Sequence, residues 1–153
     1  MGSSTIAPKT TMMSPAFYVY CIAESAAAAE LPAESLPSAI EDDSKLEWIM
    51  NNDLAALASE VPLASYSEDK LAEHLSDASW TAVRAMRHET IAEYVAKRAG
   101  IVPLRFGTIY LERAGIERML SEKARELREI LERLRGREEW GVNVFCDQSV
   151  LMS

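Results

Sequence analysis

The stretch Ile101-Val102-Pro103-Leu104-Arg105-Phe106-Gly107-Thr108-Ile109-Tyr110 is the part of the chain that decides the fold. It is an apolar, strand-like run that carries one fixed charge, Arg105, in its middle. Because arginine does not lose its proton, a buried Arg105 needs a carboxylate partner. We predict that Glu89 or Glu60 supplies this carboxylate and holds the preceding helix against a central strand.

Helical segments flank this run on both sides. The segment 67–99 has the pattern of one long helix or two abutting helices, with Ser67 as the N-cap. The segment 116–134 has a clear apolar stripe, and Gly136 ends it. In the first helix we expect the buried face to be formed by apolar residues at three- and four-residue steps and by their apolar neighbours: Leu71, Leu75, Ala78, Ala82 and Met86, with Val83, Ile91, Tyr94 and Val95.

Strand patterns occupy most of the remaining chain. Phe17–Ala23 predicts the first strand and Trp140–Phe145 the last. Leu46–Met50 and Leu54–Val61 flank asparagine and aspartate residues that suit a tight hairpin turn. The segment 25–44 is predicted to be a loop that holds one short helix. Because no regular βαβ alternation is present, we predict an α+β fold, in which two long helices cover one face of a mostly antiparallel sheet.

The composition is that of one globular domain. The 153 residues are 48% hydrophobic and 26% charged, which is enough for a proper core. We predict a flexible tail over residues 1–16, the domain over 17–146 and a C-terminal tail over 147–153. The net charge of -8 and the pI of about 4.8 disfavour nucleic acid and anionic membranes as partners. No apolar run in the sequence is long enough to span a bilayer.

The sequence lacks the common catalytic and metal-binding motifs. It has no Gly-rich phosphate loop, nucleophile elbow, CxxC or HExxH pattern. His74 and His88 would lie about 21 Å apart on one straight helix, too far to share a metal ion. Cys21 and Cys146 fit buried, reduced thiols of a cytoplasmic protein. We therefore predict no enzyme activity, cofactor or metal, and an enzyme that uses Cys21, His88 and Arg105 is the least favoured hypothesis.

Several polar and aromatic residues allow both a binding and a structural interpretation. Either Arg84, Arg87 and the His88-Glu89 pair form a polar patch beside the sheet edge that contacts another protein, or Glu89 or Glu60 neutralises Arg105 and His88 is a satisfied helix residue. The structural interpretation is the simpler one. Trp80 and Trp140 belong to a residue type that is enriched in interfaces, but buried tryptophan is more often a core anchor. We predict that both lie in the core.

Four blocks of sequence together resemble the gas vesicle protein F/L family. In chain order they are Tyr18-Val19-Tyr20-Cys21-Ile22, the segment 52–62, Trp80 with His88-Glu89, and the PLRFGT run of residues 103–108 followed by Glu138-Glu139-Trp140-Gly141-Val142-Asn143-Val144-Phe145. Two features depart from the family pattern. Asn143 stands where the family usually has lysine, and the chain stops at Ser153 where family members usually continue into a second domain.

The resemblance implies a fold and a function. It implies a ferredoxin-like α/β sandwich, which is compatible with the pattern of helices and strands. It also implies a cytoplasmic accessory protein of gas vesicle assembly that binds the hydrophobic major shell protein, with other gas vesicle accessory proteins as further partners. The alternative is a self-associating structural subunit of an accessory complex that does not contact the shell. On the first hypothesis, an exposed sheet edge is one way to bind the partner.

Overall fold

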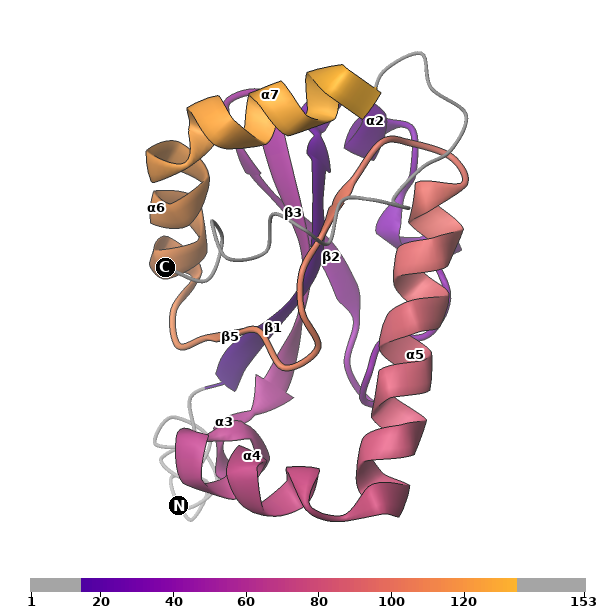
Figure 1. Ribbon diagram of the computed structural model, residues 1–153, viewed down its shortest axis with the longest axis vertical. Coiled ribbons are helices and arrows are strands. Elements are labelled where there is room, and N and C mark those ends of the chain that lie inside the picture. The colour runs from indigo at the N-terminus through magenta and orange to yellow at the C-terminus, as the bar shows by residue number, and fades with distance from the viewer. Residues whose placement is uncertain (1–14, 135–153) are drawn as a thin grey trace, which may run out of the picture.

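The computed structural model describes residues 15–134, and these form one antiparallel sheet with helices around it (Figure 1). The strands are β1 (Pro15–Glu24), β2 (Leu46–Asn51), β3 (Leu54–Pro62), β4 (Val102–Pro103) and β5 (Ile109–Tyr110). The helices are α2 (Ser25–Ala29), the 3-10 helix η1 (Ala33–Ser35), α3 (Leu63–Tyr66), α4 (Glu68–Leu75), α5 (Ala78–Ala96), α6 (Arg113–Glu122) and α7 (Ala124–Leu134). Pro15 and Ala16, which the predicted flexible tail of residues 1–16 includes, belong instead to β1 and pair with β3. The predictions for residues 1–14, for Gly136, for Trp140–Phe145, for Cys146 and for the tail from residue 147 lie outside the described residues.

The strand order confirms the predicted α+β, ferredoxin-like class. The sheet has the order β2-β3-β1-β4, and β5 also pairs with β1. Two crossovers, from β1 to β2 and from β3 to β4, generate this order. The second crossover contains α5, whereas the first contains only α2 and η1. The short helix predicted within residues 25–44 therefore takes the place of the first long helix of a simple βαββαβ unit.

The β2–β3 hairpin forms where the sequence predicts it. Asn51 pairs with Leu54, so the loop consists of Asn52 and Asp53. Asn52 has a φ of 57°, and it is the one non-glycine residue in the described chain with a positive φ. Asparagine tolerates this left-handed conformation better than other residues with a Cβ atom. The local sequence therefore sets both the position of the turn and the register of the hairpin.

The central strand β1 is buried on both faces of the sheet. Its pairing with β3 shifts by one residue between Val19 and Cys21, which is a β-bulge. Before the bulge Tyr18 and Tyr20 face the α5 side, and after it Cys21 faces the same side. Val19 and Ile22 face the opposite side, toward α6 and α7. The bulge thus inverts the alternation of the strand partway along its length.

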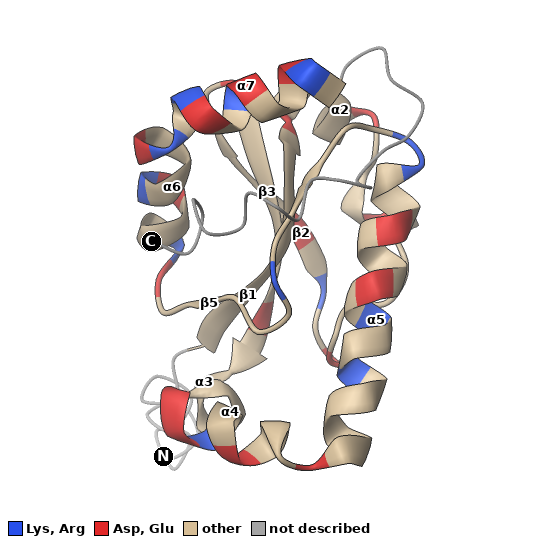
Figure 2. Cartoon of the chain, in the orientation of Figure 1, with Lys and Arg blue, Asp and Glu red and all other residues tan. Residues whose placement is uncertain are grey.

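Helices cover both faces of the sheet, so the prediction of two long helices on one face is wrong (Figure 1). The helix α5 packs on one face together with α3 and the segment 31–40, and α6 and α7 pack on the other. The physical reason is that β1 and β3 carry buried apolar residues on both faces, and each face needs its own cover. Figure 2 shows that charges are concentrated on the helices and loops, while the strands are almost uncharged.

Each of the two predicted helices is interrupted once. The first divides into α4 and α5, and Asp77 begins α5 by accepting hydrogen bonds from the backbone N–H groups of Ser79 and Trp80 at 3.0 and 3.2 Å. As predicted, the Ser67 side chain caps α4. The second helix divides into α6 and α7 at Lys123. Both interruptions let the chain change direction and follow the twisted sheet.

The decisive run of residues 101–110 is not a continuous strand. Its two ends, β4 and β5, each pair with β1 over two residues. Between them the chain turns, since Thr108 donates to the Arg105 carbonyl and Gly107 has a φ of 92°. Glycine has no Cβ atom and adopts this conformation without strain. Arg105 therefore sits in a turn instead of in the middle of a strand.

The hairpin turn gives the first prediction. Replacement of Asn52 by valine should lower the free energy of unfolding by about 1–2 kcal/mol, because a β-branched side chain is strained at positive φ. Replacement by glycine is the control and should leave stability within about 0.5 kcal/mol of the wild type. Urea denaturation followed by circular dichroism measures both. Equal stability of the two variants would contradict the assigned turn conformation.

Candidate functional site

His88 is buried inside the domain and is not part of a binding surface. Its side chain is 5% exposed. The Nε2 atom lies 3.0 Å from the Leu104 carbonyl oxygen, and the Nδ1 atom lies 2.7 Å from the Tyr18 hydroxyl. Because a carbonyl can only accept, the neutral ring carries its proton on Nε2 and accepts the Tyr18 proton at Nδ1. Burial lowers the pKa of His88, so the ring is neutral at physiological pH.

The tyrosine hydroxyls of β1 extend these contacts to two loops and a strand. The Tyr18 hydroxyl accepts from the Gly107 N–H at 3.0 Å. The Tyr20 hydroxyl lies 2.6 Å from the Ser59 hydroxyl and accepts from the Ile40 N–H at 2.9 Å. No buried side-chain nitrogen or oxygen in residues 15–134 lacks a partner. Such a satisfied network orients its elements and leaves no polar group free to bind a ligand.

Arg84 and Arg87 contact the chain itself. The Nε atom of Arg84 is 2.8 Å from Oε2 of Glu41, and the guanidinium lies over the Trp80 ring at 4.3 Å from its centroid. Arg87 donates to the Ile40 carbonyl at 2.9 Å and forms an ion pair with Asp42 at 3.0 Å. The two arginines thus tie α5 to the segment that precedes β2. With His88 buried as well, these side chains favour the structural interpretation.

Glu41 receives a second partner from α3. The Tyr66 hydroxyl donates to Oε2 of Glu41, the same oxygen that Arg84 contacts. Desolvation raises the pKa of Glu41, but the hydrogen bonds from Arg84 and Tyr66 outweigh it, and the pKa lies below the ordinary value. Glu41 is therefore ionised at neutral pH. The ion pair that the sequence predicts between Arg105 and Glu89 or Glu60 thus has a counterpart between other residues, Arg84 and Glu41.

The predicted partnership of Arg105 is wrong. Arg105, Glu89 and Glu60 are all exposed, and in the described part of the chain no ion pair joins Arg105 to either glutamate. The turn at residues 104–108 explains this, because it directs Arg105 away from the sheet. The neighbouring PLRFGT residues are structural through their backbone instead, since the Leu104 carbonyl and the Gly107 N–H bind His88 and Tyr18.

Trp80 is half-buried at the corner between α4 and α5. It packs against the core on the α5 side, with Tyr66 at a ring-centroid distance of 5.7 Å. His74 stacks on it at 4.5 Å and 10°. Trp80 therefore packs against the edge of the core and does not lie inside it as predicted, and Trp140 lies outside the described residues.

Chemistry at Cys21 is disfavoured by its surroundings. The thiol is fully buried, and burial raises its pKa to about 12. Arg105, the third member of the least favoured hypothesis, is exposed on the turn. Among residues 15–134 no group of three or more His, Cys, Asp or Glu side chains could hold a metal ion. Nor does any helix of that range have the length and apolar character to cross a membrane.

An exposed apolar surface on α5 was missed by the analysis of periodicity. Its members are Ala82, Val83 and Met86, of which Val83 is 46% and Met86 68% exposed. We call this the outer α5 surface. Leu75 of α4 and Ala78, Ala82, Val83 and Met86 of α5 were predicted to be buried, but all five are exposed, and α5 turns its other face to the sheet. That face carries Trp80, Arg84, His88, Ile91 and Val95. Because this buried face includes the polar residues Arg84 and His88, the periodicity of apolar residues does not identify it.

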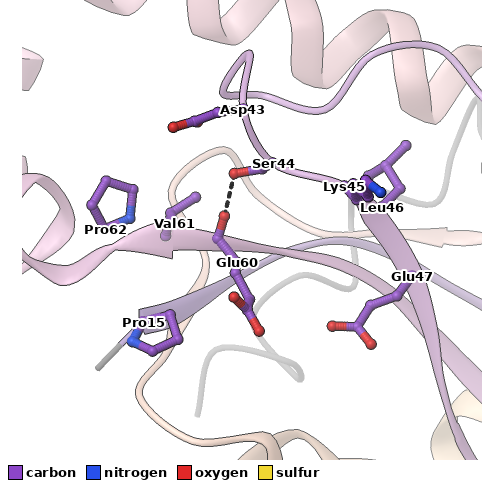
Figure 3. Close-up of a pocket in the computed structure, with 9 residues that line it drawn as sticks. All are labelled: Pro15, Asp43, Ser44, Lys45, Leu46, Glu47, Glu60, Val61 and Pro62. Atoms are coloured by element: carbon purple, nitrogen blue, oxygen red, sulfur yellow. Dashed lines mark hydrogen bonds between the residues drawn. The ribbon is translucent and has the colours of Figure 1, made fainter. Parts of the chain in front are cut away.

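The second exposed feature is the edge strand β2 with a hollow on either side of its first half. One hollow, of about 650 Å³, is lined by residues from β1, β2, β3 and the loop before β2 (Figure 3). In it the Glu60 and Glu47 carboxylates point in the same direction, and Ser44 donates to the Glu60 carbonyl (Figure 3). The other hollow, of about 590 Å³, lies between β2 and residues 33–39. Both are open surface features and resemble docking grooves more than enzyme clefts.

The burial of His88 gives a prediction on pH. Its folded-state pKa is lowered from the ordinary value of 6.5, so the unfolded chain binds the proton more tightly. The stabilisation is therefore complete above about pH 6.5 and is lost as the pH falls below it. The melting temperature should fall between about pH 7.5 and about pH 5. In His88→Gln the melting temperature should be lower at neutral pH but should change less over the same pH range. An equally steep change in this variant would contradict the assignment of the pH dependence to His88.

The contrast between Arg84 and Arg105 gives another prediction. Arg84→Met removes the charged partner of a largely buried carboxylate and should lower the free energy of unfolding by about 1–3 kcal/mol. Arg105→Met is the matched control and should change it by less than about 0.5 kcal/mol, as expected for an exposed residue that forms no ion pair within residues 15–134. The midpoints of urea denaturation measure both changes. A larger loss of stability in Arg105→Met than in Arg84→Met would support the sequence-based prediction that Arg105 is held by a carboxylate.

Comparisons with known proteins agree with the resemblance seen in the sequence. The family model described as gas vesicle synthesis protein GvpL/GvpF matches residues 16–153. Gas vesicle protein L from Streptomyces sp. (strain CB03234) is 31% identical over 99 residues, which are 65% of this chain and 37% of that protein. The crystal structure of the gas vesicle protein GvpF from Anabaena sp. PCC7120 is similar over 80% of this chain and 45% of that chain, with a TM-score of 0.55 and 21% identity.

These matches differ in what they establish. The chain spans less than half the length of either relative. At 21% identity, the likeness to the Anabaena structure concerns the fold, and it agrees with the antiparallel sheet described above. The family model, in contrast, is matched over most of the chain. The chain therefore belongs to the GvpL/GvpF family of gas vesicle synthesis proteins.

Proposed function

We propose that this domain is an accessory protein of gas vesicle assembly that binds the hydrophobic major shell protein in the cytoplasm and assists shell formation. Membership of the family supports a role connected with gas vesicles. The observation that carries the binding proposal is the outer α5 surface, where Val83 and Met86 are exposed one helical turn apart.

The chemistry of this surface suits an apolar partner. Methionine is flexible and polarizable, so Met86 can adapt to an irregular apolar surface. Leu75, at the end of α4, is also 44% exposed. Contiguous exposed apolar side chains on a soluble domain are typical of interaction sites. The net charge of -8 keeps the domain soluble while such a surface is uncovered.

The partner's own properties supply the reason for the interaction. A hydrophobic subunit that polymerises exposes apolar surface and strand edges before it is incorporated, and both invite aggregation. A soluble acidic domain that covers the apolar surface for a time would keep the subunit available for the growing shell. This role needs no catalytic group and agrees with the buried, satisfied state of His88, Tyr18 and Cys21.

The alternative function is that of a structural subunit that associates with itself. The same outer α5 surface could then be covered by a second copy of the chain. The two functions differ in what the wild-type domain does when the shell protein is absent. Self-association that depends on concentration, without binding of the shell protein, would favour the structural subunit.

A binding experiment tests the proposal. The domain is used to pull down freshly produced major gas vesicle shell protein that has not yet polymerised. The double variant Val83→Glu/Met86→Glu should reduce binding by at least about tenfold, because it places two charges in an apolar contact. Arg84 and Arg87 are unsuitable targets, since reversing their charges would break intramolecular contacts with Glu41 and Asp42.

The matched control adds the same charges elsewhere. Ala72→Glu/Ala114→Glu places two carboxylates at exposed alanines of α4 and α6 and should bind like the wild type. Equal binding by both double variants would move the site away from α5. No binding by the wild-type domain, at concentrations where both proteins are soluble, would overturn the proposed function.

A further inference from the structure

We propose that the outer edge of β2 is a second docking site, which takes an extended, basic segment of a partner protein as an added strand. This site is separate from the outer α5 surface and does not depend on the function proposed for that surface. Three observations carry it: the backbone groups of β2, the hollow beside it and the charges around it.

The outer backbone groups of β2 have no partner in the described chain. The strand lies at the end of the order β2-β3-β1-β4 and pairs with β3 alone. In a two-residue hairpin the pair that closes the loop, here Asn51 and Leu54, is hydrogen-bonded. Alternation from this pair directs the backbone N–H and C=O groups of Leu46, Trp48 and Met50 outward. No other backbone hydrogen bond within residues 15–134 reaches these three residues.

Two of the usual protections against strand addition, a proline and a bulge, are missing from this edge. Natural edge strands are commonly interrupted by proline or a β-bulge, or are covered by another element. β2 contains no proline, and its register with β3 runs from Leu46 to Asn51 without a shift. The six residues offer about 20 Å of extended backbone. Neither a proline nor a bulge in β2 therefore hinders pairing with a partner strand.

The hollow between β2 and residues 33–39 can receive a side chain of the added strand. Its volume of about 590 Å³ is sufficient for a large side chain, and Trp48 forms part of its wall. The indole Nε1–H of Trp48 donates to the Leu31 carbonyl at 2.8 Å, so this wall is held in place. Pairing of the backbone would supply affinity, and the hollow would supply selectivity for a side chain.

The charges around the edge favour a basic segment. Glu34 lines the hollow beside η1, and Asp43 and Glu60 line the hollow at the other side of β2. These three carboxylates are exposed, and none of them forms an ion pair within residues 15–134. Glu47, in contrast, is already held by Arg113 at 3.1 Å. Lys45 is the one cation among the lining residues of either hollow.

The same charges argue against a second copy as the occupant. Two β2 edges brought together would place the acidic surroundings of one against those of the other, at a cost of like-charge repulsion. The chain carries a net charge of -8, so its surface as a whole repels another copy. A segment with lysine or arginine between apolar residues is attracted to these carboxylates instead of repelled, and its alternation of charged and apolar residues suits a strand.

Peptide titration of the whole domain tests the site. The probe is an octapeptide in which valine and lysine alternate, and the matched peptide carries glutamate in place of lysine. Chemical shifts of backbone amides should change at β2 with the lysine peptide, with affinity at least about tenfold above that of the glutamate peptide. Added salt should weaken the lysine peptide's binding. Equal affinity of the two peptides, or shifts confined to other elements, would overturn the proposal.

A pair of variants at one position tests the backbone pairing. Met50→Pro removes an N–H that faces away from β3, so the hairpin should persist while binding of the lysine peptide is lost. Met50→Ala keeps the N–H and should bind like the wild type. The same peptide with N-methyl groups at alternate residues tests the pairing from the other side and should not bind. Binding by both the N-methylated peptide and Met50→Pro, or dimerisation of the wild type that Met50→Pro abolishes, would overturn the assignment.

Discussion

The contact between His88 and its two partners is the interaction on which the arrangement of the domain depends. One imidazole ring joins α5 to the central strand through Tyr18 and to the 104–108 turn through the Leu104 carbonyl. Both partners lie far from His88 in the sequence, so the ring fixes the rotation of α5 about its own axis. Once the His88 side faces the sheet, Ile91 and Val95 follow it into the core, and Val83 and Met86 are left outside.

Ionic contacts also hold α5 in place, because they join it to the segment that leads into β2. Arg84 and Arg87 hold the segment 40–42 against α5, and Glu41 also meets Tyr66 of α3. These links matter because the first crossover has no long helix of its own. The segment that leads into β2 is positioned by side chains from α5 instead. Polar residues that look like a binding patch in the sequence are therefore used to build the domain.

The surfaces left free differ in chemistry. The outer α5 surface is apolar, whereas the β2 edge presents backbone groups and carboxylates that form no ion pair within residues 15–134. The two surfaces suit different partners, because burial of apolar area has no preferred direction, whereas strand pairing needs an extended backbone with free hydrogen-bonding groups. A domain with both could hold an apolar subunit at one surface while an extended basic segment occupies the other.

Local rules in the sequence determined the hairpin, the caps and the family of this protein. The turn at Asn52, the Ser67 cap and the apolar run of β1 depend on neighbours along the chain, and the four sequence blocks that indicate the family are local as well. Only the tertiary structure decided which face of α5 is buried, that Glu41 and not Glu89 or Glu60 receives a guanidinium, and that Arg105 lies in an exposed turn. These outcomes depend on contacts between distant segments, and hydrophobic periodicity does not register a helix face that is buried through satisfied polar groups.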